Sequence, residues 1–351
     1  MSNFFSNPQR DDRQIAFWLI AVAVLIFSIV ILGGVTRLTG SGLSIVEWQP
    51  IMGAIPPLNE TQWLETFAQY QQTPQYQQVN QGMSLDAFKW IFAFEYAHRL
   101  LGRLIGVAFA LPFLYFLSQR KIRRSLIPTL ILLFALGGLQ GFVGWYMVQS
   151  GLVNEPRVSQ YRLAVHLSLA MLIYAVMLWT AWSLLQPAPR QIWKHEMQRL
   201  RRFSLLVTAT IAVMILSGAF VAGTHAGKFF NTFPLMDGHL IPMGLFAQEP
   251  FYLNFFENPA TVQFDHRLIA YILMLLIPGL WFYARRFSLS PQTRIASHLL
   301  LTVFILQVGL GITTLLNYVP VALGAAHQGG AVLLLTMALY FNHTLRRSTS
   351  F

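Results

Sequence analysis

Long apolar runs separated by short polar links are the dominant pattern along this chain. Runs of about 20 residues or more, the length that crosses a bilayer as a helix, occupy eight stretches, at 15–36, 90–117, 125–148, 161–185, 203–224, 264–284, 295–316 and 320–343. Polar and charged residues gather in the links between them. The pattern therefore predicts an all-α integral membrane protein with eight transmembrane helices.

The composition agrees with this fold class and limits the chemistry. Of the 351 residues, 55% are hydrophobic and 11% are charged, and the mean hydropathy is +0.52. These values lie far outside the range of soluble globular domains. The chain contains no cysteine, which excludes disulfides, iron–sulfur clusters, thiolate metal sites and cysteine nucleophiles. Histidine is therefore the natural ligand for any metal or haem.

The net charge of +11 comes from basic residues grouped in short links between the apolar runs. A nucleic-acid-binding protein gathers such residues on one face, so no nucleic-acid partner is expected. Most Lys and Arg residues lie on one side of the predicted spans, and the positive-inside rule places that side, with both termini, in the cytoplasm. No cleavage site follows the first run and no Arg-rich transit peptide precedes it, which favours a bacterial inner (plasma) membrane.

The opposite side carries two long connections, at roughly 37–89 and 225–263. The first contains a Gln-rich stretch with a predicted amphipathic helix over Glu60–Gln71. The second is rich in aromatic residues between Phe229 and Phe256. Such a segment is typical of the membrane interface or of a cover over an apolar ligand. The functional features are therefore expected toward the periplasmic side.

The two halves of the chain repeat each other. Three matches carry the repeat: Leu32-Gly33-Gly34 with Leu216-Ser217-Gly218, His98-Arg99-Leu100 with His266-Arg267-Leu268, and Leu139-Gln140 plus Gly144 with Leu306-Gln307 plus Gly311. Each half then holds four helices, and because four is even both halves enter the membrane from the same side. We expect two pseudo-symmetric four-helix bundles, over residues 1–185 and 203–351, joined by a cytoplasmic linker at 186–202.

Four of the nine histidines lie inside predicted spans, on the second and fourth helix of each half: His98, His166, His266 and His327. Each lies about 19–24 residues before the next cytoplasmic basic group, which places all four at one depth near the outer edge of the hydrocarbon. Facing imidazoles at one depth are what bis-histidine ligation of a haem iron requires. A single buried histidine is often explained by an interhelical hydrogen bond, but four at repeated positions favour ligation.

The other histidines receive no ligand role. Three are expected as surface residues near the cytoplasmic links and two in the second outer loop: His195, His298 and His343, and His225 and His239. A binuclear metal centre is disfavoured because Glu95 is the only in-span carboxylate on the face of a histidine. Asp265 is adjacent to its histidine in sequence and so points off that face.

Glu95 lies three residues before His98, so the two share a helix face, whereas the second half carries Gln263 at the matching position. An acid can shuttle a proton or stabilise positive charge, and an amide can only hydrogen-bond. Catalysis is therefore assigned to the first half. Four arginines toward the outer side are candidates to pair with haem propionates, with lipid headgroups as the alternative: Arg99, Arg103, Arg162 and Arg267.

The chain resembles the haem A synthase family over almost its whole length. The resemblance rests on Gly34-Val35-Thr36-Arg37-Leu38-Thr39, Ser41-Gly42-Leu43-Ser44, Glu47-Trp48, Glu95-Tyr96-x-His98-Arg99, Gln140-Gly141-x-x-Gly144-Trp145 and Asn231-Thr232-Phe233-Pro234-Leu235-Met236-Asp237-Gly238. Some members of the family carry a cysteine pair in the outer loops. Because it has no cysteine, the chain resembles the proteobacterial and mitochondrial branch of the family.

The resemblance implies an oxidoreductase that oxidises the C8 methyl group of haem O to a formyl group through hydroxylated intermediates, giving haem A for cytochrome oxidase. It implies a permanent haem b on His266 and His327, and the substrate haem near His98 and His166 with Glu95 taking part in the oxidation. The expected partners are haem O, delivered by haem O synthase, an unidentified electron acceptor and the lipid bilayer, with homo-oligomer formation left open. The alternatives are a non-enzymatic b-type cytochrome between quinol and a partner, and a haem or solute transporter.

Overall fold

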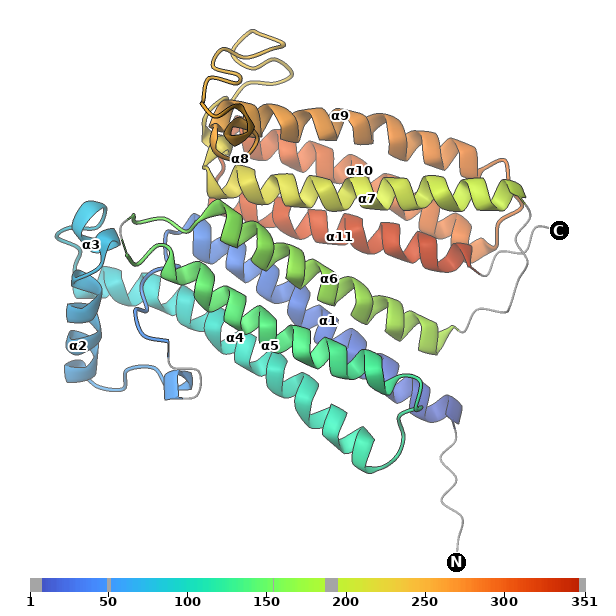
Figure 1. Cartoon of the computed structure of the whole chain (residues 1–351), viewed down its shortest axis with the longest axis horizontal. Coiled ribbons are helices and arrows are strands. Elements are labelled where there is room, and N and C mark those ends of the chain that lie inside the picture. The colour runs from blue at the N-terminus through green and yellow to red at the C-terminus, as the bar shows by residue number, and fades with distance from the viewer. Residues whose placement is uncertain (1–7, 49–51, 154, 187–194, 347–351) are drawn as a thin grey trace, which may run out of the picture. The chain divides into compact units, whose positions relative to one another are not determined.

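The computed structural model describes residues 8–48, 52–153, 155–186 and 195–346, and its regular structure there is helical (Figure 1). The α-helices of these residues are α1 (Pro8–Leu38), α2 (Glu60–Gln71), α3 (Pro74–Gln78), α4 (Leu85–Ser118), α5 (Ile127–Gln149), α6 (Gln160–Leu185), α7 (His195–Gly223), α8 (Asn254–Glu257), α9 (Pro259–Ala284), α10 (Pro291–Leu316) and α11 (Val321–Leu345). The all-α prediction is confirmed.

Eight of these helices in the described part of the chain are long and apolar enough to cross a membrane: α1, α4, α5, α6, α7, α9, α10 and α11. They match the eight predicted spans one for one, which makes the chain a multi-pass membrane protein. Several begin earlier than the apolar runs because a polar capping residue starts the helix. Ser84 accepts a hydrogen bond from Ala87 N, and Asn258 accepts one from Ala260 N with Pro259 at the first helical position.

The chain divides into two compact units, residues 1–174 and 175–351. The division falls inside α6, upstream of the linker expected at 186–202, and residues 187–194 of that linker lie outside the described part. In each unit the long connections gather at one end of the helices, which we call the long-loop end, and short links join the other end.

In the first unit, α4 packs against α1 on one side and α5 on the other. The indole of Trp18 on α1 donates a hydrogen bond to the carbonyl of Ala108 on α4 (2.8 Å). At the short-loop end, Arg123 forms an ion pair with the buried Asp12. The N-terminal end of α1 and the link after α4 therefore share one end of this unit. Helix α6 is joined to α5 by the hydrogen bonds of Gln140 with His166 and of Arg162 with Tyr146.

In the second unit, four helices close a ring. Helix α7 packs on α9, α9 on α10, α10 on α11 and α11 back on α7. Asn342 on α11 donates to the Thr208 hydroxyl on α7 (2.8 Å), which adds a polar contact across the last of these seams. A four-helix bundle with close packing on all four seams encloses a central space lined by side chains of facing helices.

The predicted amphipathic helix over Glu60–Gln71 is confirmed, with the same bounds, as α2. Asn59 caps it, and its apolar side packs on the start of α4 around the fully buried rings of Tyr70 and Phe88. The Tyr70 hydroxyl donates to Gln75 and accepts from Asn80. Burial raises the pKa of the Tyr70 phenol. This small cluster fixes the first long connection to the long-loop end of α4.

One expectation about the short-loop end is wrong. His343 near the end of α11 was expected at the surface, but its side chain is buried, with a relative exposure of 1%. Its ring packs edge-on against Trp179 (centroids 5.3 Å apart) and against Trp182 (5.8 Å), both on the last turns of α6. The helix-end position suggested exposure, but a neighbouring helix covers it. His298 is exposed as expected.

Candidate functional site

The four in-span histidines form two pairs, one in each unit. His98 on α4 is close enough to His166 on α6 for the charge of one ring to act on the other, and His266 on α9 stands in the same relation to His327 on α11. All four helices begin at the long-loop end, and each imidazole lies about two to four turns along its helix. Each side chain is only partly buried.

The histidine on the last helix of each pair is held by the preceding helix in the same way in both units. Gln140 Nε2 on α5 donates to the His166 carbonyl (3.0 Å) and lies 3.2 Å from His166 Nδ1. Gln307 Nε2 on α10 donates to the His327 carbonyl (2.9 Å) and lies 3.1 Å from His327 Nδ1. The repeated glutamines therefore fix the orientation of the two rings.

Glycines lie against the same two rings. A Cβ atom at Gly144 would stand 2.8 Å from the His166 ring, and one at Gly311 would stand 2.8 Å from the His327 ring. Real Cβ atoms avoid such a distance, so the absence of a side chain at these positions lets each imidazole approach the neighbouring helix closely.

The first helix of each unit approaches the other histidine of the pair. A Cβ atom at Gly33 on α1 would be 3.1 Å from His98 Nε2, and one at Gly218 on α7 would be 3.5 Å from His266. Ser217, which the sequence match pairs with Gly33, also lies beside His266, and its hydroxyl hydrogen-bonds with His266 Nδ1 (3.2 Å). Gly33 has no hydroxyl to offer His98.

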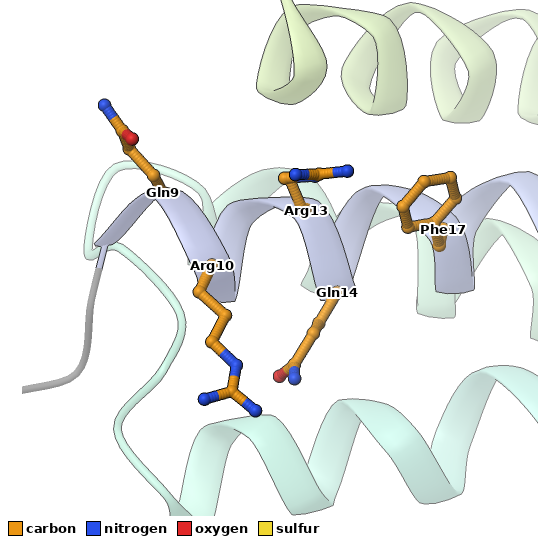
Figure 2. A pocket seen from close by; sticks show the side chains of 5 residues that line it. All are labelled: Gln9, Arg10, Arg13, Gln14 and Phe17. Atoms are coloured by element: carbon orange, nitrogen blue, oxygen red, sulfur yellow. The ribbon is translucent and has the colours of Figure 1, made fainter.

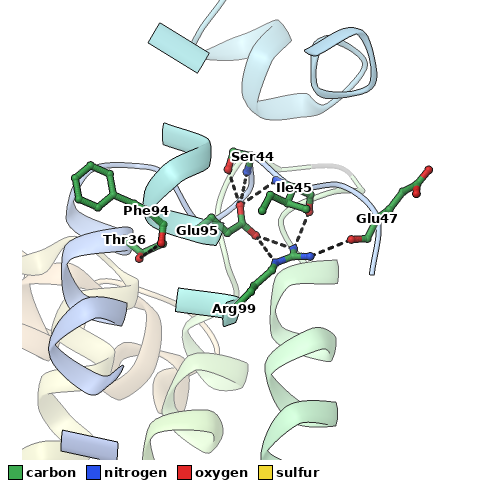
Figure 3. Close-up of polar contacts among 7 residues, drawn as sticks. All are labelled: Thr36, Ser44, Ile45, Glu47, Phe94, Glu95 and Arg99. Carbon is green, nitrogen blue, oxygen red and sulfur yellow. Dashed lines mark hydrogen bonds and ion pairs between the residues drawn. The ribbon is translucent and has the colours of Figure 1, made fainter. Parts of the chain in front are cut away.

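Glu95 is buried, with a relative exposure of 3%, and its carboxylate is surrounded by donors (Figure 3). Its Oε2 accepts from Ser44 N (2.7 Å), Ser44 Oγ (2.8 Å) and Ile45 N (2.9 Å). Its Oε1 accepts from Arg99 Nη2 (2.7 Å) and Nε (3.0 Å) in a bidentate ion pair. Arg99 also donates to the carbonyls of Ile45 and Glu47. The Glu95–Arg99 pair thus joins α4 to the connection after α1.

The matching residues of the second unit also hold a loop, with the opposite polarity. Gln263 Nε2 donates to the carbonyl of Phe230 (3.1 Å), and Arg267 Nη2 donates to the same carbonyl (3.0 Å). The residue three before the histidine and the residue after it therefore anchor the loop that precedes their helix in both units. A carboxylate accepts from backbone N–H groups in the first unit, whereas an amide donates to a backbone carbonyl in the second.

The remaining candidate arginines also lie at the long-loop end. Arg103 is one turn beyond Arg99 on α4. Arg162 Nη1 donates to the carbonyl of Tyr146 (2.6 Å), and its guanidinium lies 3.7 Å from the centre of the Tyr146 ring. Within the described residues neither Arg162 nor Arg267 forms an ion pair with a carboxylate, although Arg267 is 8% exposed. A buried cation of this kind is suited to an anionic ligand group.

These features fit a haem group in each unit. The donor set is two facing imidazoles, which is the ligand set of a bis-histidine haem iron. The rings are only partly buried, a glycine lies close to each of them, and Arg267, beside the second pair, forms no ion pair with a carboxylate among the described residues. Haem carries two propionates, for which a guanidinium is the natural partner.

A surface pocket of ≈ 410 Å³ lies elsewhere, near the short-loop end of α1. It is lined by Gln9, Arg10, Arg13, Gln14 and Phe17. Figure 2 shows Gln9 and Arg10 pointing to opposite sides of the helix, so the polar groups do not converge on one position. The paired histidines, not this hollow, are therefore the candidate site.

The fold and the site together define a multi-pass, all-α membrane protein with two paired-histidine sites of the type that holds haem. The profile of the COX15-CtaA family, described as "Cytochrome oxidase assembly protein", matches residues 16–339. The chain therefore belongs to this family.

Relatives named "Heme A synthase" match the chain almost end to end. The protein of that name from Nitrosospira multiformis is 54% identical over 346 residues, 97% of each chain. The one from Rhizobium meliloti is 48% identical over 335 residues, 95% of this chain and 90% of its own. "Heme A synthase COX15" from Arabidopsis thaliana is 46% identical over 350 residues, 97% of this chain and 76% of its own.

Two residues of the site were not identified from the sequence. Ser44 holds the Glu95 carboxylate from about 50 positions away in the chain, and Ser217 hydrogen-bonds to His266. Ser44 had a sequence signal, since it ends the Ser41-Gly42-Leu43-Ser44 part of the family resemblance. Ser217 had none, because the sequence match aligned it with a glycine.

Proposed function

We propose that this protein converts haem O into haem A in a membrane, acting as an oxidoreductase on the C8 methyl group. The observation that carries the proposal is that two similarly built histidine pairs differ in the residue three positions before the first histidine of each pair. Glu95 stands beside the first pair and Gln263 beside the second. The family description and the relatives' printed names point to the same activity.

The second unit is assigned a permanent haem b, with His266 and His327 as axial ligands and Arg267 beside a propionate. Its support is structural: α7, α9, α10 and α11 close a ring, and Ser217 and Gln307 orient the two ligands. Such supported ligands are typical of a resident cofactor. When bound, a haem at this site supplies one-electron redox chemistry.

The first unit is assigned the substrate, with His98 and His166 as ligands of haem O. In its support, the His98 ring forms no hydrogen bond within the described residues like the one between Ser217 and His266 in the second unit. A substrate has to bind and a product has to leave, which a ligand held by fewer contacts permits. Arg99, Arg103 and Arg162 are assigned to the propionate end.

Glu95 is assigned an electrostatic part in the oxidation. In all five hydrogen bonds at its carboxylate the carboxylate oxygen is the acceptor, which suits an acceptor-only, negatively charged group. A proton shuttle would have to break this arrangement at each turnover. A fixed negative charge one turn from His98 instead stabilises positive charge that develops on the substrate.

The environment of the reaction is proposed from the charge pattern. Both termini lie in the cytoplasm, the histidine pairs lie toward the periplasmic side, and the membrane is the bacterial inner membrane. The reaction needs haem O, supplied by haem O synthase, and an electron acceptor of unknown identity. Homo-oligomer formation stays open.

The experiment that tests the function is extraction and chromatographic separation of the pigments from the purified protein. Haem O or haem A together with haem b is the expected result. A b-type cytochrome, the main alternative, would yield haem b alone, and a transporter would bind haem without producing haem A from haem O. Either result would contradict the proposal.

A further inference from the structure

The connection between α7 and α9 carries large apolar side chains that contact little. Leu240, Ile241 and Met243 have relative exposures of 81%, 68% and 80%. They belong to a run from Leu240 to Ala247 that contains no charged residue. We call residues 240–247 the apolar tip. Several exposed apolar side chains in one short segment mark a surface that meets something other than water.

The apolar tip has a defined conformation despite this exposure. Before it, Met236 and His239 pair through two backbone hydrogen bonds (2.9 and 3.1 Å). Within it, Asn258 Nδ2 donates to the carbonyl of Gly244 (2.8 Å), and Phe246 N donates to the hydroxyl of Thr261. The exposed side chains are therefore held outward by the fold at the start of α9.

The segment leading to the tip lies along the flank of α9. Arg267 donates to the carbonyls of Phe230 and Leu235, and the Tyr271 hydroxyl donates to the carbonyl of Pro234 (3.2 Å). Tyr271 is about 18 Å along a helix of about 39 Å, measured from Pro259. Because the hydrocarbon core is about 30 Å thick, Tyr271 lies inside it wherever the helix is centred.

This flank of α9 has the exposed apolar side chains of a surface that faces lipid. Leu268, Tyr271 and Leu275 recur at helical spacing on one face and are exposed, Leu275 to 77%. Figure 1 shows the connection projecting sideways past the long-loop end of α9 in the second unit, and not onward along the helix axis. The apolar tip therefore lies beside the bilayer, at the level of its surface.

We propose that the apolar tip is a membrane anchor, with Leu240, Ile241 and Met243 inserted into the headgroup and acyl boundary of the leaflet at the long-loop end. Lipid is the occupant because the tip is uncharged and its root lies on the lipid-facing flank of α9. The anchor holds the α7–α9 connection, which contacts Arg267 beside the second histidine pair. The proposal concerns a lipid surface and is independent of the reaction that the protein catalyses.

The absence of cysteine allows a direct test, since one introduced thiol carries the only label. Ile241→Cys is labelled with a nitroxide in the full-length protein, with its haem, in single-copy lipid nanodiscs. Collision rates with oxygen, which enters lipid, and with a water-soluble nickel complex are then measured. The expected ratio of oxygen to nickel collisions is several-fold higher than at Glu65→Cys, a control on the charged, exposed side of α2.

Leu275→Cys supplies the matched lipid control because its side chain is exposed on the same helix flank. A ratio at Ile241 equal to that at Glu65 means that the tip is in water and overturns the proposal. Low collision rates with both reagents mean that protein covers the tip, and this also overturns it. Unchanged haem content in all three variants shows that each is folded.

Discussion

In both units a glutamine on the third helix and a glycine close to the ring hold the histidine of the fourth helix. The other histidine of each pair has different neighbours, because Ser217 hydrogen-bonds with His266 in the second unit whereas Gly33 lies beside His98 in the first. Under the proposed function, the site that holds a haem and the site that acts on one therefore use the same kind of ligand and differ in the residues around it.

The loop anchors sharpen this comparison. In the first unit Glu95 accepts three hydrogen bonds from the Ser44–Ile45 segment, whereas Gln263 and Arg267 in the second donate to the Phe230 carbonyl. The residue three positions before the histidine therefore anchors a loop in both units. Only in the first unit is the anchoring residue a carboxylate, so under the proposed function Glu95 both anchors the loop and takes part in the oxidation.

The largest effect is expected from removing an axial ligand of the second unit. His266→Ala or His327→Ala should abolish haem b binding, because bis-histidine ligation leaves no other protein ligand for the iron. Reduced-minus-oxidised spectra and extracted haem b measure this. His98→Ala and His166→Ala are the matched variants of the first unit and should lose haem A formation while keeping haem b. Equal loss of haem b from all four variants would show that the units do not have separate sites.

The next effect concerns Glu95. Glu95→Gln should lower the conversion of haem O by roughly 10²-fold or more, the scale of a lost charged catalytic group, with both haems still bound and haem O accumulating. The amide also places a donor against donors from Ser44, Ile45 or Arg99. Loss of the loop anchor could therefore lower conversion as well, and this cause has to be separated from loss of the charge.

Ser44→Ala separates the two causes. It removes one donor to Glu95 Oε2 and keeps the charge, which should cost about 1 kcal/mol of anchoring, or about fivefold. Conversion rates of the two variants, measured side by side, show whether the lost charge or the lost loop anchor lowers activity. If Ser44→Ala were as damaging as Glu95→Gln, the role of Glu95 would be to hold the loop, and parental activity in Glu95→Gln would remove its catalytic role altogether.

A smaller effect is expected from the glutamines that orient the ligands. Gln307→Leu should weaken haem b retention by about tenfold, the lower end for partners of metal ligands, and should also shift the midpoint potential of the haem. Gln140→Leu should slow conversion by about tenfold. Redox titration and turnover measure the two effects. Each variant is the control for the other, because a change confined to its own unit is expected. A loss of haem b from Gln140→Leu would contradict this.

Much of the fold was predictable because a helix that crosses hydrocarbon needs a long apolar run. All eight spans were found in this way, and the Glu60–Gln71 helix was found from its amphipathic pattern. The two histidine pairs were also predictable, since their recurrence on matching helices placed them at one depth. Helical spacing likewise put Glu95 on the face of His98.

The contacts of these residues were not predictable. Ser44 and Glu95 are about 50 positions apart, and no local pattern says where a loop returns to a helix. His343 stands near a helix end, yet Trp179 and Trp182 cover it, because burial depends on a neighbouring helix. The repeat match paired Gly33 with Ser217, but only the structure shows that these residues lie beside His98 and His266.

The smallest and most graded effect concerns the glycines against the histidine rings. An added Cβ at Gly144 or Gly311 would stand 2.8 Å from its ring, so the imidazole has to rotate away from its present position. A rotation of this kind costs about 0.5–1.5 kcal/mol, which is up to about tenfold in affinity or rate. Gly144→Ala should therefore slow conversion and Gly311→Ala should weaken haem b retention.

The chain offers matched controls for this series. At Gly138 and Gly309, on the same two helices, an added Cβ meets nothing within 4 Å, so alanine there should leave both measurements unchanged. On the first helix of each unit, Gly33→Ala (3.1 Å from His98) should act more strongly than Gly218→Ala (3.5 Å from His266). Substrate conversion and haem b content, measured across the series, should follow these distances. An effect at Gly138 as large as at Gly144 would mean that helix packing, and not the orientation of the ligand, explains the glycines.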